Sequence, residues 1–149
     1  MKNLYTYKVR IVRILDGDTV DVDIDLGFGI WMAGERIRIF GIDTPEVRTR
    51  DNIEKTFGFA AKDRVEDLLE ENAILVSIEY ERGKFGRILG DFILEDGRKL
   101  STVLLEEGHA LPYGSQANEI SQQERSDLQE ENRKKLIENG KVVLPPTPE

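Results

Sequence analysis

Alternating apolar and polar residues mark two strands at the start of the chain. In residues 5–15 the apolar positions change parity at Ile11-Val12, which predicts a β-bulge there. In residues 19–26 every second residue is aliphatic, and most residues between them are aspartates. Asp16-Gly17-Asp18 separates the two strands, and an Asp-Gly pair tolerates the positive φ angles of a tight turn. The pattern therefore predicts an antiparallel hairpin.

Two connections flank a third strand, which the alternation places at residues 35–40. The first connection, residues 27–34, contains glycine but is unusually apolar for a loop because it carries Phe28 and Trp31. We expect it to fold over an open end of the core, with a surface for a partner or substrate as the alternative. The second connection, residues 47–55, is polar and is expected to be an exposed loop.

The middle of the chain changes from strand to helical periodicity and back. A helix is predicted from residue 57 or 58 to residue 71, where Ala61, Val65, Leu68 and Leu69 recur at helical spacing. Two further strands are predicted at residues 73–80 and 87–94.

The last third of the chain predicts two helices and an extended end. Ser101 is placed to cap a short helix that Gly108 would end. A second helix is expected over residues 120–138, and its narrow apolar face indicates weak docking or fraying. Prolines concentrate in the final residues and predict a flexible tail over residues 141–149.

These elements indicate an α+β fold with one domain over residues 1–140. Short strands joined by hairpins favour a five-stranded β-barrel of the OB type, here with about three helices. The chain length of 149 residues suits one domain with a single core.

Composition narrows the functional classes. The formal net charge of −8 argues against a nucleic-acid binder that works by bulk attraction, although a local arginine cluster with a bound cation can still reverse the field in one cleft. The chain has no cysteine, so disulfides and thiolate metal sites are excluded. The start lacks the apolar run of a signal peptide, and no segment is predicted to span a membrane. The chain is therefore expected to be soluble and intracellular, with the cytoplasm as the location if one is named. Separately, we expect a monomer.

Three turns carry the side chains that are candidates for binding a metal or for catalysis. They are Asp16-Gly17-Asp18-Thr19, Asp43-Thr44-Pro45-Glu46 and Lys84-Phe85-Gly86-Arg87, each at the end of a predicted strand. The Asp21, Asp23 and Asp25 series does not fit a calcium-binding EF-hand loop and is read as a solvated strand face. His109 has no partnered acid or nucleophile in the sequence pattern, so we interpret it as structural or surface-exposed.

The three turns together offer what phosphodiester hydrolysis requires. Asp18, Asp43 and the Thr44 carbonyl would supply hard oxygen ligands suited to calcium or magnesium. Arg38 and Arg87 would clamp a phosphate with several donors each, and Glu46 would lie near the attacking water.

The order of these motifs resembles that of the staphylococcal nuclease (thermonuclease-like) family. Asp-Gly-Asp-Thr is followed by Arg-x4-Asp-Thr-Pro-Glu and then by Lys-aromatic-Gly-Arg, and the resemblance covers roughly residues 5–138. It implies an OB-fold barrel with a calcium-dependent site that cleaves DNA and RNA with little sequence preference and leaves 3′-phosphates.

The resemblance also implies a role for each matching residue. Asp18 and Asp43 would bind calcium together with the main-chain oxygen of Thr44. Asp16 would lie next to these ligands without binding the ion itself. Glu46 would orient or deprotonate the water, and Arg38 and Arg87 would hold the phosphate and its transition state. The residues expected to contact the rest of the substrate are Lys84, Phe85 and Tyr113.

Several features depart from the family pattern. Phe85 replaces a tyrosine, which removes a phenol hydrogen bond to phosphate, and the connection before the third strand is longer. The chain is acidic, whereas the best-known members are basic and exported. One alternative is a non-catalytic OB-fold module that binds an oligonucleotide or a protein partner. Another treats the carboxylates as turn formers and the arginines as surface charge.

Overall fold

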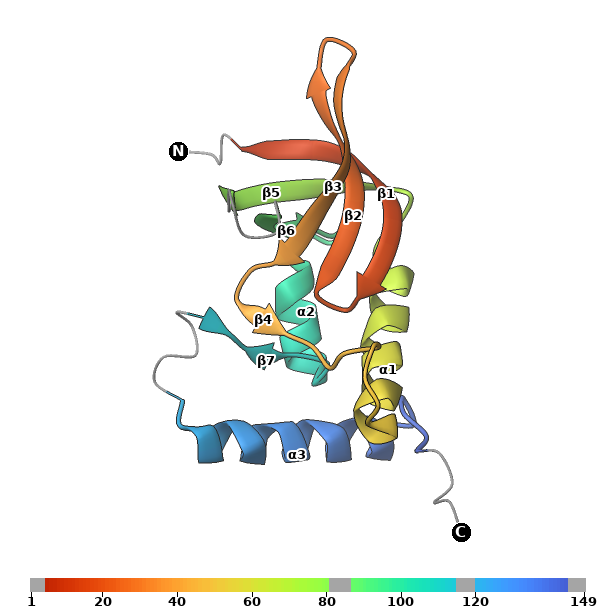
Figure 1. The fold of residues 1–149 in the computed structure, drawn as a ribbon, viewed down its shortest axis with the longest axis vertical. Helices are drawn as coiled ribbons and strands as arrows, with labels where there is room; N and C mark the ends of the chain where they lie inside the picture. The colour runs from red at the N-terminus through yellow and green to blue at the C-terminus, as the bar shows by residue number, and fades with distance from the viewer. Residues whose placement is uncertain (1–4, 81–86, 115–119, 145–149) are drawn as a thin grey trace.

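Five strands close into a barrel in the computed structural model, which describes residues 5–80, 87–114 and 120–144 (Figure 1). The barrel order is β1-β2-β3-β6-β5, closed by pairing of β1 with β5. Neighbouring strands are antiparallel except β3 and β6, which run parallel. This arrangement confirms the predicted five-stranded barrel. The strands span Thr6–Asp16 (β1), Thr19–Gly27 (β2), Ile30–Ile39 (β3), Asn72–Tyr80 (β5) and Ile88–Ile93 (β6).

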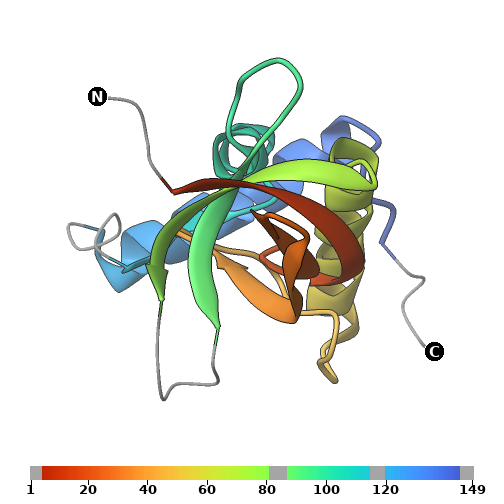
Figure 2. The same ribbon diagram turned by 90° about the horizontal axis from the view of Figure 1, so that it is seen from above.

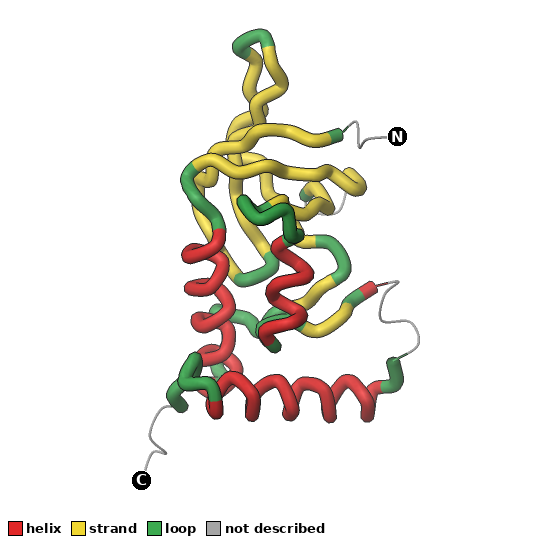
Figure 3. The backbone as a smooth tube through the Cα atoms, turned by 180° about the vertical axis from the view of Figure 1, so that it is seen from behind, coloured by secondary structure: helices red, strands yellow, loops and turns green. Residues whose placement is uncertain are grey.

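Three helices and a small second sheet lie below the barrel (Figures 1 and 3). The two short strands β4 (Ile42–Asp43) and β7 (Leu111–Pro112) pair antiparallel to each other. Seen from above, the strands form a closed ring, and the helices lie behind this ring (Figure 2). No helix in the described ranges is both long and apolar enough to cross a membrane. The helices span Asn52–Leu68 (α1), Leu100–Glu107 (α2) and Gln122–Glu138 (α3).

The core fills the barrel and extends onto α1 and α2. Val20, Val22 and Ile24 of β2 are buried, as their alternation predicts. They form one cluster with Phe92 of β6 and with the apolar faces of α1 and α2. The barrel and these two helices therefore share one hydrophobic core.

The outer face of the first hairpin carries charged side chains that form ion pairs. Arg10 binds Asp23 at 3.1 Å and Arg36 binds Asp21 at 2.9 Å, each across neighbouring strands. The register of β1 against β2 shifts at Val12, which confirms the predicted bulge. The aspartate series thus serves as a solvated strand face with cross-strand partners.

The prediction that residues 27–34 fold over the core is wrong. β2 and β3 continue as a long hairpin that projects away from the barrel, at the top of Figure 1. Gly27, Phe28 and Gly29 all have positive φ and close the hairpin tightly. The strands therefore satisfy their backbone groups by pairing with each other, which leaves Phe28 fully exposed.

Two helix starts also differ from their predictions. α1 begins at Asn52 because the Asp51 carboxylate accepts hydrogen bonds from the Ile53 and Glu54 amides at 3.0 and 3.2 Å. α2 begins at Leu100 without a side-chain cap, so Ser101 is not its cap. The Ser101 hydroxyl instead donates to buried Asp91. The end of α2 at Gly108, in the left-handed conformation, agrees with the sequence.

Helix α3 docks mainly through polar contacts. Its one buried residue, Leu136, packs with Phe57 and Val142. Lys135 donates to the Glu106 carbonyl at 2.6 Å, which ties the helix to the end of α2. Residues 145–149 lie outside the described part of the chain, so the boundary of the tail at residue 141 stays a prediction.

His109 is buried beside the end of α2, with 4% of its surface exposed. Burial lowers its pKa, Arg64 and Lys141 lower the pKa further, and the Glu107 carboxylate 4.0 Å away opposes them. The folded protein therefore disfavours the imidazolium form.

We expect this histidine to make the fold sensitive to acid. Because the unfolded chain takes up the proton first, the contribution is complete above pH about 6.5 and is lost as the pH falls towards the lowered folded pKa. Urea unfolding between pH 7.5 and 5.5 should show a slope of up to about 1.4 kcal/mol per pH unit. The single-histidine chain makes His109→Leu a clean control, and parallel curves for the two proteins would contradict the assignment.

Candidate functional site

Asp18 joins the first turn to two later parts of the chain. Its side chain is almost fully buried, and one carboxylate oxygen accepts from the Thr19 hydroxyl at 2.9 Å. The other accepts from the Thr44 amide at 3.0 Å, while the Asp18 carbonyl accepts from the Ile39 amide at 2.8 Å. The β1–β2 turn, the end of β3 and the segment after β4 are thus fastened at one aspartate.

Arg38 lies between Asp18 and Asp43. Its Nη1 is 3.4 Å from Asp18 Oδ2, and its Nη2 is 3.6 Å from Asp43 Oδ1. Nη1 also donates to the carbonyls of Ile42 at 2.9 Å and Ile39 at 3.2 Å, so the arginine holds the bend between β3 and β4. The structure therefore brings together three residues that the sequence placed in one site.

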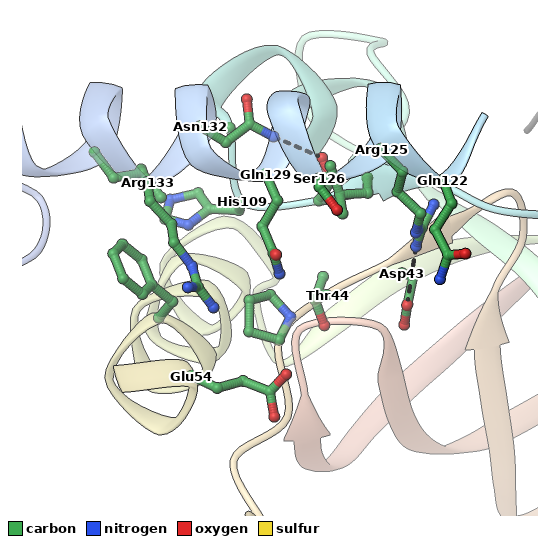
Figure 4. Close-up of a pocket in the computed structure, with 16 residues that line it drawn as sticks. Asp43, Thr44, Glu54, His109, Gln122, Arg125, Ser126, Gln129, Asn132 and Arg133 are labelled. Atoms are coloured by element: carbon green, nitrogen blue, oxygen red, sulfur yellow. Dashed lines mark hydrogen bonds and ion pairs between the residues drawn. The ribbon is translucent and has the colours of Figure 1, made fainter. Parts of the chain in front are cut away.

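A second arginine, missed by the sequence reasoning, also contacts Asp43. Arg125 reaches from α3 and its Nη2 lies 3.2 Å from Asp43 Oδ2 (Figure 4). Its Nη1 donates to the Pro112 carbonyl at 2.6 Å. Nothing in the sequence distinguishes Arg125 from the other charges of α3. Its partner is 82 positions away, so only the folded chain reveals the pair.

A cavity of about 230 Å³ lies on the α3 side of Asp43 and Thr44 (Figure 4). Thr44 Oγ1 and His109 Nδ1 are buried there without a hydrogen-bond partner among the described residues. A polar cavity of this kind suits ordered water, which pairs with such atoms. The metal-ligand candidates are thus backed by a cavity with room for water rather than by close packing alone.

The two aspartates are an electrostatically demanding pair. Burial raises the pKa of Asp43, and the nearby Asp18 charge raises it further. The guanidinium groups of Arg38 and Arg125 act in the opposite direction. Carboxylates held this close together favour a positive charge between them, which the fold supplies in part through Arg38.

Glu46 stands on a loop that is fixed at both sides. The Thr44 amide is bonded to Asp18, and the Val47 amide donates to Asp16 Oδ1 at 3.0 Å. Glu46 itself is exposed, and its carboxylate has no hydrogen bond or ion pair within the described ranges. The loop is held by its neighbours while the Glu46 carboxylate stays available to solvent.

Gly58 of α1 permits this loop position. A Cβ added at Gly58 would lie 2.5 Å from the Glu46 carbonyl oxygen and 2.7 Å from its carbonyl carbon. Real Cβ atoms do not approach backbone this closely, so the loop packs on the helix only where the side chain is absent. In the sequence this glycine gives no signal beyond its presence in a helix.

The other residues predicted to contact the substrate are Tyr113, Arg87, Lys84 and Phe85. Tyr113 is more than half exposed, and its ring centroid is 5.6 Å from the Arg38 guanidinium carbon. Arg87 is half-buried just before β6, and its role at a phosphate stays a prediction. Lys84 and Phe85 lie outside the described residues.

The donor set fits a hard divalent cation. Asp18 and Asp43 supply two carboxylates to one location, and oxygen ligands of this kind suit calcium or magnesium. In the described part of the chain no group of three or more His, Cys, Asp or Glu residues is positioned around one ion. Main-chain oxygens, water or a substrate phosphate would have to complete the six to eight ligands that calcium takes.

The sequence profile of the family described as "Staphylococcal nuclease homologue" matches residues 36–138, well over half of the chain. The chain belongs to this family. The match begins at the end of β3 and includes Arg38, Asp43 and Glu46. The resemblance inferred from the motif order is thereby confirmed.

Individual relatives carry endonuclease names. An "Uncharacterized endonuclease" of Escherichia coli is 31% identical over 104 residues, which cover 70% of this chain and 60% of that protein. The "SPbeta prophage-derived endonuclease YokF" of Bacillus subtilis is 29% identical over 144 residues, 91% of this chain and 46% of the relative. The "Thermonuclease" of Staphylococcus intermedius is 32% identical over 103 residues, 67% and 56% of the two chains. The matched segment therefore spans at most about 60% of each relative.

Replacing Gly58 with alanine should disturb the Glu46 loop. The added methyl must push against main-chain atoms, and we expect the free energy of unfolding to fall by about 1–3 kcal/mol. An unobstructed Gly→Ala change inside a helix would instead stabilise by about 0.5–1 kcal/mol, so the sign is diagnostic. Urea unfolding measures the change, and the Glu46 amide signal in NMR should shift. Asp63→Ala, exposed on the same helix, is the control, with an effect within about 0.5 kcal/mol.

Proposed function

We propose that this protein is a calcium-dependent nuclease that hydrolyses phosphodiester bonds in DNA or RNA with little sequence preference. The observation that carries the proposal is the grouping of Asp18, Asp43 and Arg38 next to the loop that presents Glu46. Family membership supports the reaction class, because the matched relatives are named as endonucleases and a thermonuclease.

The metal site in this proposal uses oxygen atoms only. Asp18, Asp43 and the Thr44 carbonyl would hold the ion, with Asp16 supporting them through its bond to the Val47 amide. Bound calcium would neutralise charge on the phosphate and help to orient water. The Asp18–Thr44 hydrogen bond keeps two of the proposed ligands in register before any ion binds.

Glu46 is the proposed general base. Its carboxylate is exposed and unpaired in the described structure, so it can accept a proton from a water molecule beside the phosphate. The water oxygen forms a new bond to phosphorus and the bond from phosphorus to the 5′-oxygen breaks. The 5′-oxygen takes up a proton, and the other product keeps a 3′-phosphate.

Arginine donors would stabilise the charge on the phosphate oxygens. Arg38 is anchored through Nη1 to two carbonyls and its Nη2 lies 3.6 Å from Asp43, so a phosphate bound at the aspartates would meet a guanidinium held in a fixed position. Arg87 would contribute from the start of β6, and Tyr113, whose ring centroid is 5.6 Å from the Arg38 guanidinium carbon, would contact the substrate beside Arg38. Lys84 and Phe85 are proposed to contact more distant parts of the substrate.

Glu46→Gln should remove catalysis and retain binding. The amide keeps the shape of the side chain but cannot accept the proton, so turnover should fall at least about a hundredfold. We would measure cleavage of single-stranded DNA in calcium and in excess chelator, and binding by fluorescence anisotropy.

The matched control for this experiment is Glu66→Gln, on an exposed part of α1. It makes the same chemical change away from the site and should leave turnover within about twofold of the wild type. Equal turnover of Glu46→Gln and wild type would show that Glu46 is not the general base. Absence of calcium-dependent cleavage in the wild type at micromolar protein would refute the nuclease proposal itself.

Calcium should stabilise the wild-type fold by binding to the paired aspartates. At a calcium concentration of 100 times Kd the stabilisation is about 2.7 kcal/mol, which differential scanning calorimetry resolves. Asp18→Asn and Asp43→Asn should each abolish most of this shift, because each removes a charged ligand. Asp21→Asn, on the outer face of the same hairpin, should keep it. A shift that persists in both site variants would locate the calcium elsewhere.

A further inference from the structure

A groove of about 920 Å³ lies beside the Glu46 loop, and half of the residues that line it are basic. The loop after β4 contributes Arg48 and Arg50, and α1 contributes Lys55 and Lys62. Arg13 of β1 and Arg36 of β3 line the same groove, where the one acidic residue is Asp16. The Asp16 carboxylate already accepts a hydrogen bond from the amide of Val47, which also lines the groove.

Most of these positive charges are not neutralised by the protein. Arg36 is paired with Asp21, but the other five have no ion pair with any residue in the described ranges. The whole chain carries a net charge of −8, so a local excess of this size runs against its overall balance. Concentrated positive charge in a groove attracts a chain of phosphates even when the protein as a whole is acidic.

The groove also offers an aromatic surface. Phe59 is 44% exposed and lines the groove between Lys55 and Lys62 on α1. These three residues are spaced four and three positions apart, so they share one face of the helix. Lys62 lies 5.9 Å from the centre of the Phe59 ring. Alternating cations and an exposed ring are the features by which proteins bind unpaired bases and their backbone.

The groove borders the loop that carries the candidate catalytic residue. Val47 and Arg48 line it, and Glu46 is the next residue along the same loop. We propose that this groove binds single-stranded nucleic acid and guides the strand to Glu46. The guiding role rests on the proposed nuclease function, whereas binding in the groove does not.

The test compares two triple variants with the same change in net charge. Arg48→Gln, Arg50→Gln and Lys55→Gln alter three exposed groove residues, whereas Lys99→Gln, Lys134→Gln and Lys141→Gln alter three exposed lysines outside it. Both sets are made in the Glu46→Gln protein, so that binding is measured without cleavage. The probe is a fluorescein-labelled 12-nucleotide single strand, followed by anisotropy over a range of salt concentrations in the presence of calcium.

The groove triple variant should bind at least about tenfold more weakly at low salt. Its slope of log K against log salt should be shallower by about 2, because each phosphate contact to a single strand contributes about 0.7. The control triple variant should change affinity less than about threefold through bulk charge. Phe59→Leu alone should weaken binding at least about fivefold with the salt slope unchanged, since it removes stacking and no charge.

Several outcomes would overturn the proposal. Equal weakening in the two triple variants would show attraction by bulk charge, and no weakening in the groove variant would show that the strand binds elsewhere. Binding to vesicles with 25% phosphatidylserine, without binding to the oligonucleotide, would assign the groove to a membrane surface. Circular dichroism verifies that each variant is folded.

A cleavage assay separates this proposal from the nuclease proposal. With Glu46 intact, the groove triple variant should raise KM for a long single strand and leave kcat, and its activity on a dinucleotide, within about twofold of wild type. A wild-type protein that binds through the groove but never cleaves would refute the nuclease function and leave the groove proposal standing.

Discussion

The arrangement of the candidate site depends on one guanidinium between two carboxylates. Asp18 is almost fully buried and Asp43 is half-buried, and holding two carboxylates from different parts of the chain close together is unfavourable unless positive charge is supplied. Arg38 supplies that charge and also satisfies the carbonyls of Ile39 and Ile42. The same group therefore forms the bend after β3 and makes the carboxylate pair tolerable. Under the proposed function, a bound cation would add to the positive charge that Arg38 supplies.

The Glu46 loop shows how backbone contacts can position a side chain that has no partner. Asp18 and Asp16 hold the amides of Thr44 and Val47, and Gly58 gives the loop room against α1. None of these contacts uses the Glu46 carboxylate, which stays available for chemistry. Since Arg48 and Arg50 follow on the same loop, the anchors that position Glu46 also position part of the basic groove.

Sequence reasoning identified what is local and missed what is distant. Alternation and turn chemistry predicted the first hairpin, its bulge and the barrel, because strand period and Asp-Gly turns act over a few residues. The contact of Arg125 with Asp43 and the closeness of Gly58 to Glu46 depend on tertiary packing, so no local pattern reveals them. The apolar 27–34 segment was misread because hydrophobicity suggested burial, whereas backbone pairing drew it into a projecting hairpin.

Net charge was the least informative property of this chain. Screening limits interactions between exposed charges to about 8 Å at physiological salt, so a phosphate in the groove responds to the cations beside it more than to the distant acidic surface. Two of the aspartates on the barrel are already paired with Arg10 and Arg36, which reduces their reach further. The acidic remainder can then act in the opposite sense, because it repels nucleic acid from surfaces outside the groove and the candidate site. An overall negative charge would in this way make nucleic acid bind more selectively at the basic groove, and would not prevent that binding.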